Sequence, residues 1–234
     1  ILWSILMGKY GIIIKGKDRH IQIDSFNTVM NCIRKQTVVM KGGIVSGNQG
    51  YYTELPITPH LSTKLFAVSP NNVFVKVIGG AIKGSDKNIQ ISQPYNDSSG
   101  SVDVFEFGDF PNNIFKEKYG VVIKNSSTKQ TVYNSNWGVL KIVGYFIASW
   151  KEDIDYQLPN IKDLAFVFGG GMGGIWEDGF EGAWMDTFIK RVGNTLQVRY
   201  KEAVLWSTGS ANRDLSRFPS TCLIIDVSDI KKVL

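Results

Sequence analysis

The sequence predicts an all-β protein built from two related β-sandwich-like halves, with at most one or two short helices. Short runs of β-branched and aromatic residues are separated by Gly, Asn, Asp, Ser and Pro, as in strands joined by turns. Residues 88–92 (NIQIS) and 101–107 (SVDVFEF) alternate apolar and polar side chains, which is the period of a strand with one buried face. A strand-turn-strand pattern also occurs twice in the chain, which favours two related halves.

Further strands are expected along the chain, in order. Apolar runs at residues 10–15 (YGIIIK), 20–24 (HIQID) and 72–79 (NVFVKVIG) predict strands in the N-terminal half. In the C-terminal half, residues 164–168 (LAFVF) predict a strand after a turn that begins at Asn160. Gly193-Asn194 separates two β-rich runs, and this pair suits the positive φ angles of a two-residue hairpin.

One segment has an ambiguous period. Phe180, Trp184, Phe188 and Val192 recur every four residues, which fits a stripe on a helix but is also a multiple of the strand period. The neighbouring glycines weaken a helix, so the sequence favours an irregular lead into the hairpin, with one short helix as the alternative.

The repeated pattern predicts the domain organisation. The stretch YGIIIKGKDRHIQIDS from Tyr10 aligns with YGVVIKNSSTKQTVYNS from Tyr119. We therefore expect an N-terminal extension at residues 1–9, a first β-domain at 10–115 and a second at 116–234, which can also pack as one unit. The opening hexapeptide ILWSIL lacks the features of a signal peptide, and no apolar run is long enough to span a membrane.

Composition and charge disfavour several classes of function. The chain has 234 residues, and its 26 Lys and Arg against 21 Asp and Glu give a formal charge of +5. These positive charges are scattered rather than clustered, so we expect no nucleic-acid binding. Two histidines and two cysteines are too few soft ligands for a Cys/His zinc site, and we expect no metal. Cys32 and Cys222 can form at most one disulfide, and free buried thiols are the open alternative.

The glycine-rich run at residues 169–174 (GGGMGG) has the spacing of a dinucleotide-binding loop. The residues that follow it contain more glycines and make a poor helix, so we expect no cofactor there. The chain has no GxSxG motif, and His20 and His60 are expected to be structural or surface residues. Without a recognisable acid and base, we expect no catalytic residues and no enzyme activity.

A Trp-rich segment at residues 176–184 is the candidate binding site. It contains Trp176, Glu177, Asp178, Glu181 and Trp184. Aromatic rings beside carboxylates can stack on sugars and accept hydrogen bonds from their hydroxyl groups. The competing interpretation is that the tryptophans fill the core and the acids face solvent.

Residues 118–146 carry a resemblance to a known family. Tyr119, Gly120, Asn125, Ser135 and Trp137 form a pattern that resembles uncharacterised tail-associated virion proteins of tailed bacteriophages. The first copy carries it also, at Tyr10, Gly11, Asp24 and Ser25. The resemblance implies a viral structural protein of the phage tail, at its tip or near its fibres, and it implies no catalytic residues.

The functional prediction follows from the resemblance and from the tendency of a sheet edge to pair with the edge of a neighbouring protein. We expect a structural component of the virion that assembles with other phage tail proteins and with copies of itself, as a ring or a trimer. The alternative is a receptor- or glycan-binding module for host attachment that uses residues 176–184. A glycosidase that acts on host polysaccharide is the third option.

Overall fold

The computed structural model describes residues 5–8, 11–15, 20–24, 30–40, 52–56, 62–78, 88–94, 97–109, 121–124, 128–129, 131–134, 138–149, 152–170, 174–177, 181–207 and 220–230. Nearly all of this part of the chain is strand, and it contains no α-helix. The all-β prediction is therefore confirmed.

The two longest strands, Glu181–Val192 (β16) and Thr195–Ser207 (β17), lie in the second half of the chain. In the first half they are Ile5–Gly8 (β1), Gly11–Lys15 (β2), His20–Asp24 (β3), Asn31–Met40 (β4), Tyr52–Pro56 (β5), Ser62–Asn71 (β6), Lys76–Ile78 (β7), Asn88–Ser92 (β8) and Gly100–Asp109 (β9). In the second half they are Val122–Lys124 (β10), Thr131–Asn134 (β11), Lys141–Ala148 (β12), Ile154–Gln157 (β13), Leu164–Gly170 (β14), Gly174–Glu177 (β15), Glu181–Val192 (β16), Thr195–Ser207 (β17) and Ser220–Asp226 (β18).

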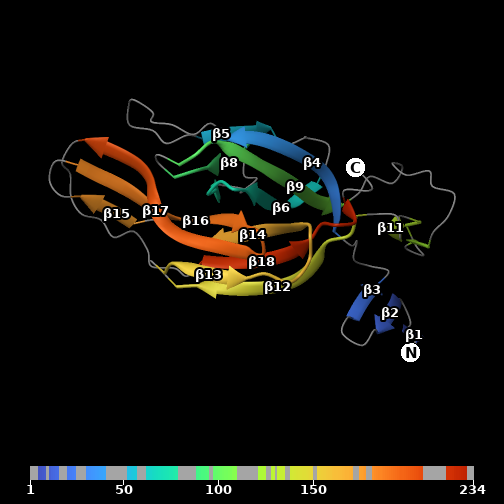
Figure 1. Cartoon of the computed structure of the whole chain (residues 1–234). Coiled ribbons are helices and arrows are strands. Elements are labelled where there is room, and N and C mark those ends of the chain that lie inside the picture. Colours follow the sequence, from blue (N-terminus) through green and yellow to red (C-terminus); the bar gives the residue numbers. More distant parts are fainter. Residues whose placement is uncertain are drawn as a thin grey trace.

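A 10-stranded sheet forms the body of the protein (Figure 1). Its main path runs β12-β18-β14-β6-β16-β17-β13, while β9 and β4 extend from β6, and β15 pairs with β16. β6 is the junction, because it pairs with β9 along its length, with β14 at Val68–Phe166 and with β16 at Asn71–Arg191. Strands from both sides of residue 115 thus share one sheet, and the domain boundary there stays a prediction.

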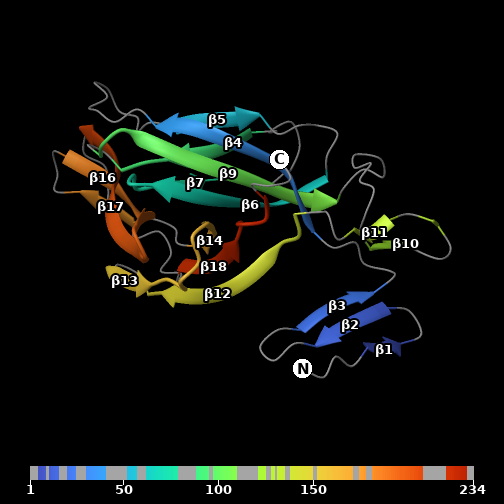
Figure 2. The same ribbon diagram turned by 45° about the vertical axis from the view of Figure 1, so that its right-hand side comes forward.

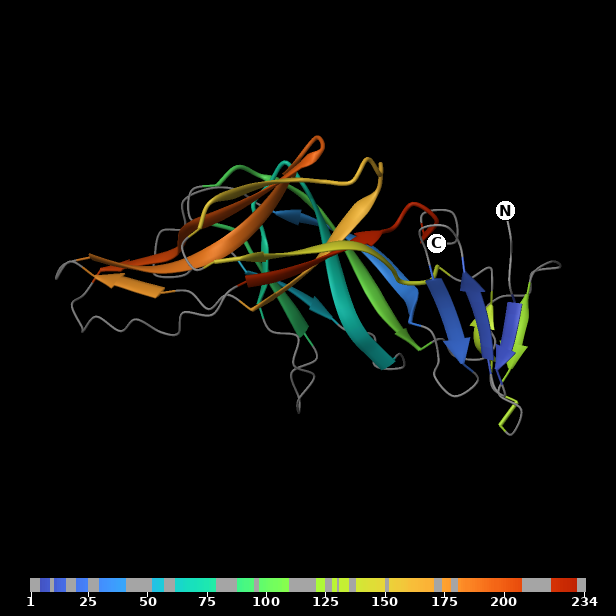
Figure 3. The ribbon, with the colours of Figure 1, turned by 90° about the horizontal axis from the view of Figure 1, so that it is seen from below.

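Both copies of the repeated pattern form antiparallel hairpins. In the first copy β2 pairs with β3, from Gly11–Asp24 to Lys15–His20. In the second copy β10 pairs with β11, and Val122 lies opposite Asn134. The two hairpins belong to small sheets outside the main one, and these sheets lie at the same end of the molecule (Figures 2 and 3). The relation between the two halves beyond these hairpins stays a prediction.

The main sheet curls so that its two end strands approach each other. Phe146 on β12 and Tyr156 on β13 stack with their ring centroids 4.9 Å apart. The turn between these strands is closed by Ser149 and Glu152, because the Glu152 N–H donates to the Ser149 carbonyl at 3.2 Å and the Ser149 N–H donates to Glu152 Oε2 at 2.8 Å. The curl encloses the core.

Apolar side chains fill both sides of the sheet around β14. The alternation of LAFVF gives Phe166 to the larger core cluster and Ala165 to the smaller one. The larger cluster also includes Val68, Val104, Ile189, Val198 and Ile224, and the smaller one includes Cys32, Phe105, Phe107 and Ile225. This packing explains why the predicted strand at residues 164–168 is apolar at every position.

The hairpin at Gly193-Asn194 is confirmed. Val192 pairs with Thr195, and Gly193 has a φ of 57°. Asn194 has no positive φ, so the turn needs a positive φ only at Gly193, the first of its two central residues. This is the pattern of a type II′ turn, which needs glycine at that position.

The expectation of an irregular lead into this hairpin was wrong. Residues 181–192 form the continuous strand β16, which pairs with β17 along its length and with β15 at its start. The two flanking strands hold the backbone of Gly182 in a ladder, so its weak propensity does not interrupt the strand. The β16–β17 ladder does contain one irregularity, a register shift between Trp184 and Met185.

Candidate functional site

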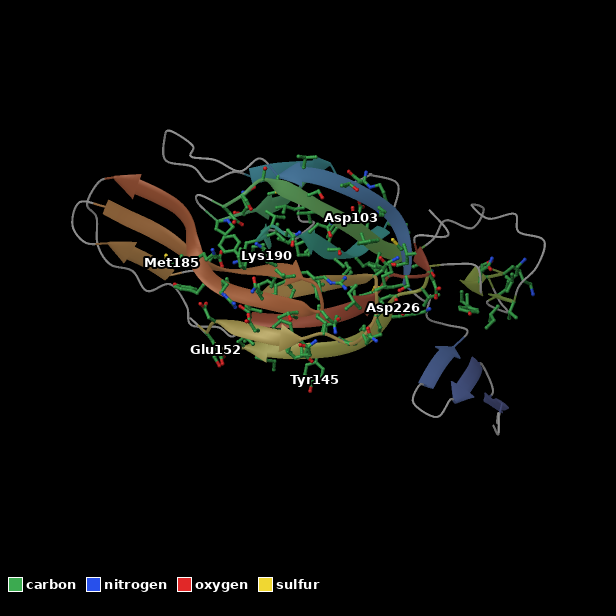
Figure 4. All side chains as sticks on the ribbon, in the orientation of Figure 1. Asp103, Tyr145, Glu152, Met185, Lys190 and Asp226 are labelled. Atoms are coloured by element: carbon green, nitrogen blue, oxygen red, sulfur yellow. The ribbon has the colours of Figure 1, made fainter. Side chains whose placement is uncertain are left out.

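Strand β12 presents an exposed apolar face at one end of the main sheet. Ile142, Tyr145 and Ile147 are 56%, 69% and 59% exposed, and we call these three residues the β12 face. Phe146 and Ala148 alternate with them and are buried in the core. Figure 4 shows Tyr145 projecting away from the body of the protein. β12 therefore buries one face in the core and exposes large apolar side chains on the other.

The surroundings of the β12 face limit what can bind there. Tyr145 lies opposite Leu223 on β18, so the apolar surface continues onto the neighbouring strand there, whereas Ile147 lies opposite the exposed polar residue Thr221. From Ile142 to Ala148 the strand carries no charge. At its start, Lys141 is paired with the Asp229 carboxylate. The centre of the surface is apolar and its charges lie at the ends, which suits a protein partner.

The β12 backbone forms a ladder on one side and approaches β13 on the other. Among the strands that the structure describes, β12 forms a ladder with β18 alone. Natural proteins usually protect such edges with charges, prolines or bulges. β12 has a register shift between Ile142 and Gly144, and the stretch from Gly144 to Ala148 is regular. Because Phe146 in this stretch stacks on Tyr156 of β13, a partner would contact the outward side chains of β12.

A buried ion pair forms a second cluster, on the side of β16 opposite the core. Lys76 on β7 contacts the Asp186 carboxylate on β16, and the two side chains are 10% and 4% exposed. The Val75–Ile189 bridge brings their strands together through two backbone hydrogen bonds of 2.9 Å. The Thr187 N–H donates to Asp186 Oδ1 at 2.8 Å.

Two further lysines lie beside this pair. The Nζ atoms of Lys190 and Lys201 are 5.2 and 4.4 Å from the ring centroid of Phe74, which is itself buried. Ammonium groups at this distance are attracted to an aromatic face. Lys201 also lies opposite Asp186 in the β16–β17 ladder.

Sequence reasoning missed this cluster. In the run NVFVKVIG, Lys76 occupies an alternating position that would normally face water. Its partner Asp186 is 110 residues away in the chain, so no local pattern links the two. The one available signal was a charged residue inside an otherwise apolar strand.

The Trp-rich segment lies on two paired strands. Trp176 pairs with Ala183, Glu177 with Gly182 and Trp184 with Ile175, so the two tryptophans stand on neighbouring rungs of the β15–β16 ladder. Glu181 begins β16 opposite Ser207. The side chains of these four residues and all of Asp178 lie outside the described part of the chain. The glycan- or receptor-binding role of the segment stays a prediction.

The glycine-rich run joins two strands. Gly169 and Gly170 end β14, where they pair with Thr221 and Ser220. Gly174 begins β15, so a strand stands where a dinucleotide-binding loop needs the first turn of a helix. Of the two histidines, His20 ends the pairing of β3 with β2 opposite Lys15, and His60 lies outside the described residues.

Cys32 and Cys222 are free and buried, so the disulfide left open by the sequence does not form. Burial raises the pKa of Cys32 from 9.0 to about 12 and also raises the pKa of Cys222. We predict that neither thiol reacts with a thiol reagent in the native protein at neutral pH and that both react after unfolding, as measured by mass spectrometry. Rapid labelling of the native protein would contradict this burial.

The same shift has a consequence at alkaline pH. The folded state holds the Cys32 proton more tightly than the unfolded state does. The protonated thiol therefore contributes fully to the free energy of unfolding below pH 9, and this contribution is lost as the pH rises toward about 12.

Comparison with known proteins adds no family to these observations. No family model, curated protein or solved structure matches the chain. The described part of the chain contains no helix that is long and apolar enough to cross a membrane.

Proposed function

We propose that this protein is a structural component of a bacteriophage tail, at the tip or near the fibres, and that it assembles through the β12 face. The exposed apolar surface of an end strand is the observation that supports this role. The resemblance to tail-associated proteins over residues 118–146 supports a role in a phage particle. The resembling stretch includes the first six residues of β12. The expected partners are other copies of this chain and neighbouring tail proteins.

Assembly through this surface is favourable for two physical reasons. Removing a large apolar side chain from water contributes about 1.5–3 kcal/mol, and three such side chains lie on the β12 face. Leu223 on β18 lies opposite Tyr145, so a partner would also cover part of the neighbouring strand. In a ring or trimer, each copy would cover the edge of the next, so exposed edges would not persist in the particle.

The expected result is concentration-dependent self-association of the purified chain, measured by analytical ultracentrifugation. Tyr145→Lys together with Ile147→Lys should reduce this association by at least about tenfold, because two charges would then be buried in an apolar contact. Val39→Lys is the matched control, since Val39 is also 69% exposed but lies on β4. This control should associate like the wild type.

Two results would count against the proposal. One is a wild-type chain that stays monomeric at high concentration and binds no other tail protein. The other is equal loss of association in the control, which would indicate a general effect of added charge. Mass spectrometry of purified phage particles tests the virion location directly, and the chain should be present there in several copies.

A further inference from the structure

The buried pair of Lys76 and Asp186 differs in its exposure from the ion pair of Lys141 and Asp229. Lys141 and Asp229 are also in contact, but their side chains are 38% and 56% exposed. Lys76 and Asp186 are 10% and 4% exposed, and Phe188, whose position in β16 lies between Asp186 and Lys190, is fully buried. Water therefore reaches the Lys141–Asp229 pair easily and the Lys76–Asp186 pair poorly.

We propose that Lys76 and Asp186 become joined by an intramolecular amide bond between Nζ and Cγ. Such a bond would be a modification site that links β7 covalently to β16. The inference rests on the geometry of this pair and does not depend on the phage-tail role.

The reaction is a condensation between two groups that are already in contact. The proton on Lys76 Nζ passes to Asp186 Oδ1, the oxygen that Nζ contacts, which leaves a neutral amine and a neutral carboxylic acid. The Nζ lone pair then attacks Cγ, so the N–C bond forms and negative charge develops on Oδ2. When this intermediate collapses, the bond from Cγ to Oδ1 breaks, and Oδ1 leaves as water with that proton and a second one from nitrogen. No oxidant, reductant or other reactant is needed.

Three features of the site favour this step. The ladder holds Nζ against the carboxylate, so the reacting groups need no diffusional encounter. The Thr187 N–H donates to Oδ1 at 2.8 Å and so holds the carboxylate in place beside Nζ. An amide is neutral, so its formation removes two buried charges and the desolvation penalty that they carry.

The decisive measurement is mass spectrometry of the purified wild-type chain. The expected intact mass is lower than the sequence mass by one water molecule. Proteolysis should release a branched peptide in which Lys76 is joined to Asp186. Because this measurement needs no variant, it does not depend on whether a substituted chain folds.

Matched controls separate this bond from other losses of water. Lys76→Arg keeps the positive charge but should restore the full sequence mass. The peptides that contain Lys141 and Asp229 should stay linear, because that pair is exposed. The Asp178-Gly179 sequence can lose water by forming a succinimide, so the peptide map must assign the loss to residues 76 and 186.

Two outcomes would overturn the inference. A folded wild-type chain with the full sequence mass would show that the pair remains ionic. A mass deficit that maps to Asp178, or that persists in Lys76→Arg, would place the loss of water elsewhere.

Discussion

Replacing Asp186 by alanine is expected to lower the free energy of unfolding by about 3–5 kcal/mol. The substitution leaves the Lys76 ammonium group at a site where its side chain is 10% exposed. It also leaves the Thr187 N–H without the carboxylate oxygen that accepts from it at 2.8 Å. Urea denaturation monitored by tryptophan fluorescence would measure the change.

The exposed pair provides the control for this prediction. Lys141→Ala removes a lysine whose side chain is 38% exposed, and the expected loss is about 0–1 kcal/mol. The double replacement of Lys76→Met and Asp186→Leu should be more stable than Asp186→Ala alone, because no charge is then left without its partner. If Asp186→Ala and Lys141→Ala had equal effects, the buried pair would not anchor β7 to β16.

Phe166→Ala is the second substitution with a large expected effect, a loss of about 3–5 kcal/mol. Phe166 is fully buried and lies opposite Val68 on β6 and Ile224 on β18. The truncation opens a cavity at the place where three strands meet, and paired backbones on both sides limit its collapse. The same denaturation experiment measures this loss.

Ile147→Ala is the matched control for a truncated apolar residue. Ile147 is 59% exposed, so its truncation should change the stability of the monomer by no more than about 0.5 kcal/mol. A small effect of Phe166→Ala would mean that β6 does not hold the two parts of the main sheet together. A large effect of Ile147→Ala on the monomer would mean that the β12 face is covered within the chain.

The sequence was sufficient to predict the strands whose signal is local. Residues 88–92 match β8, and residues 101–107 lie within β9, because alternation needs only neighbouring residues. Gly193 allowed the hairpin to be placed to the residue, since its positive φ is a property of that single position. The two copies of the hairpin pattern were also found, because each closes within one short stretch.

Local patterns were insufficient where pairing decides the structure. Residues 181–192 show a period that fits both a helix and a strand, and the ladders to β15 and β17 make them a strand. The exposed position of β12 follows from the order of strands in the sheet, which no run of residues encodes by itself. The same is true of β6, which connects strands from distant parts of the chain.

The sequence by itself therefore determined that this protein is built from strands and where the Gly193-Asn194 turn lies, because those properties depend on side-chain alternation and on the φ of one glycine. The tertiary structure alone decided that Lys76 meets Asp186 and that Tyr145 faces outward. The physical reason is that burial depends on which sheet faces cover one another, and those faces are brought together by residues about 110 positions apart.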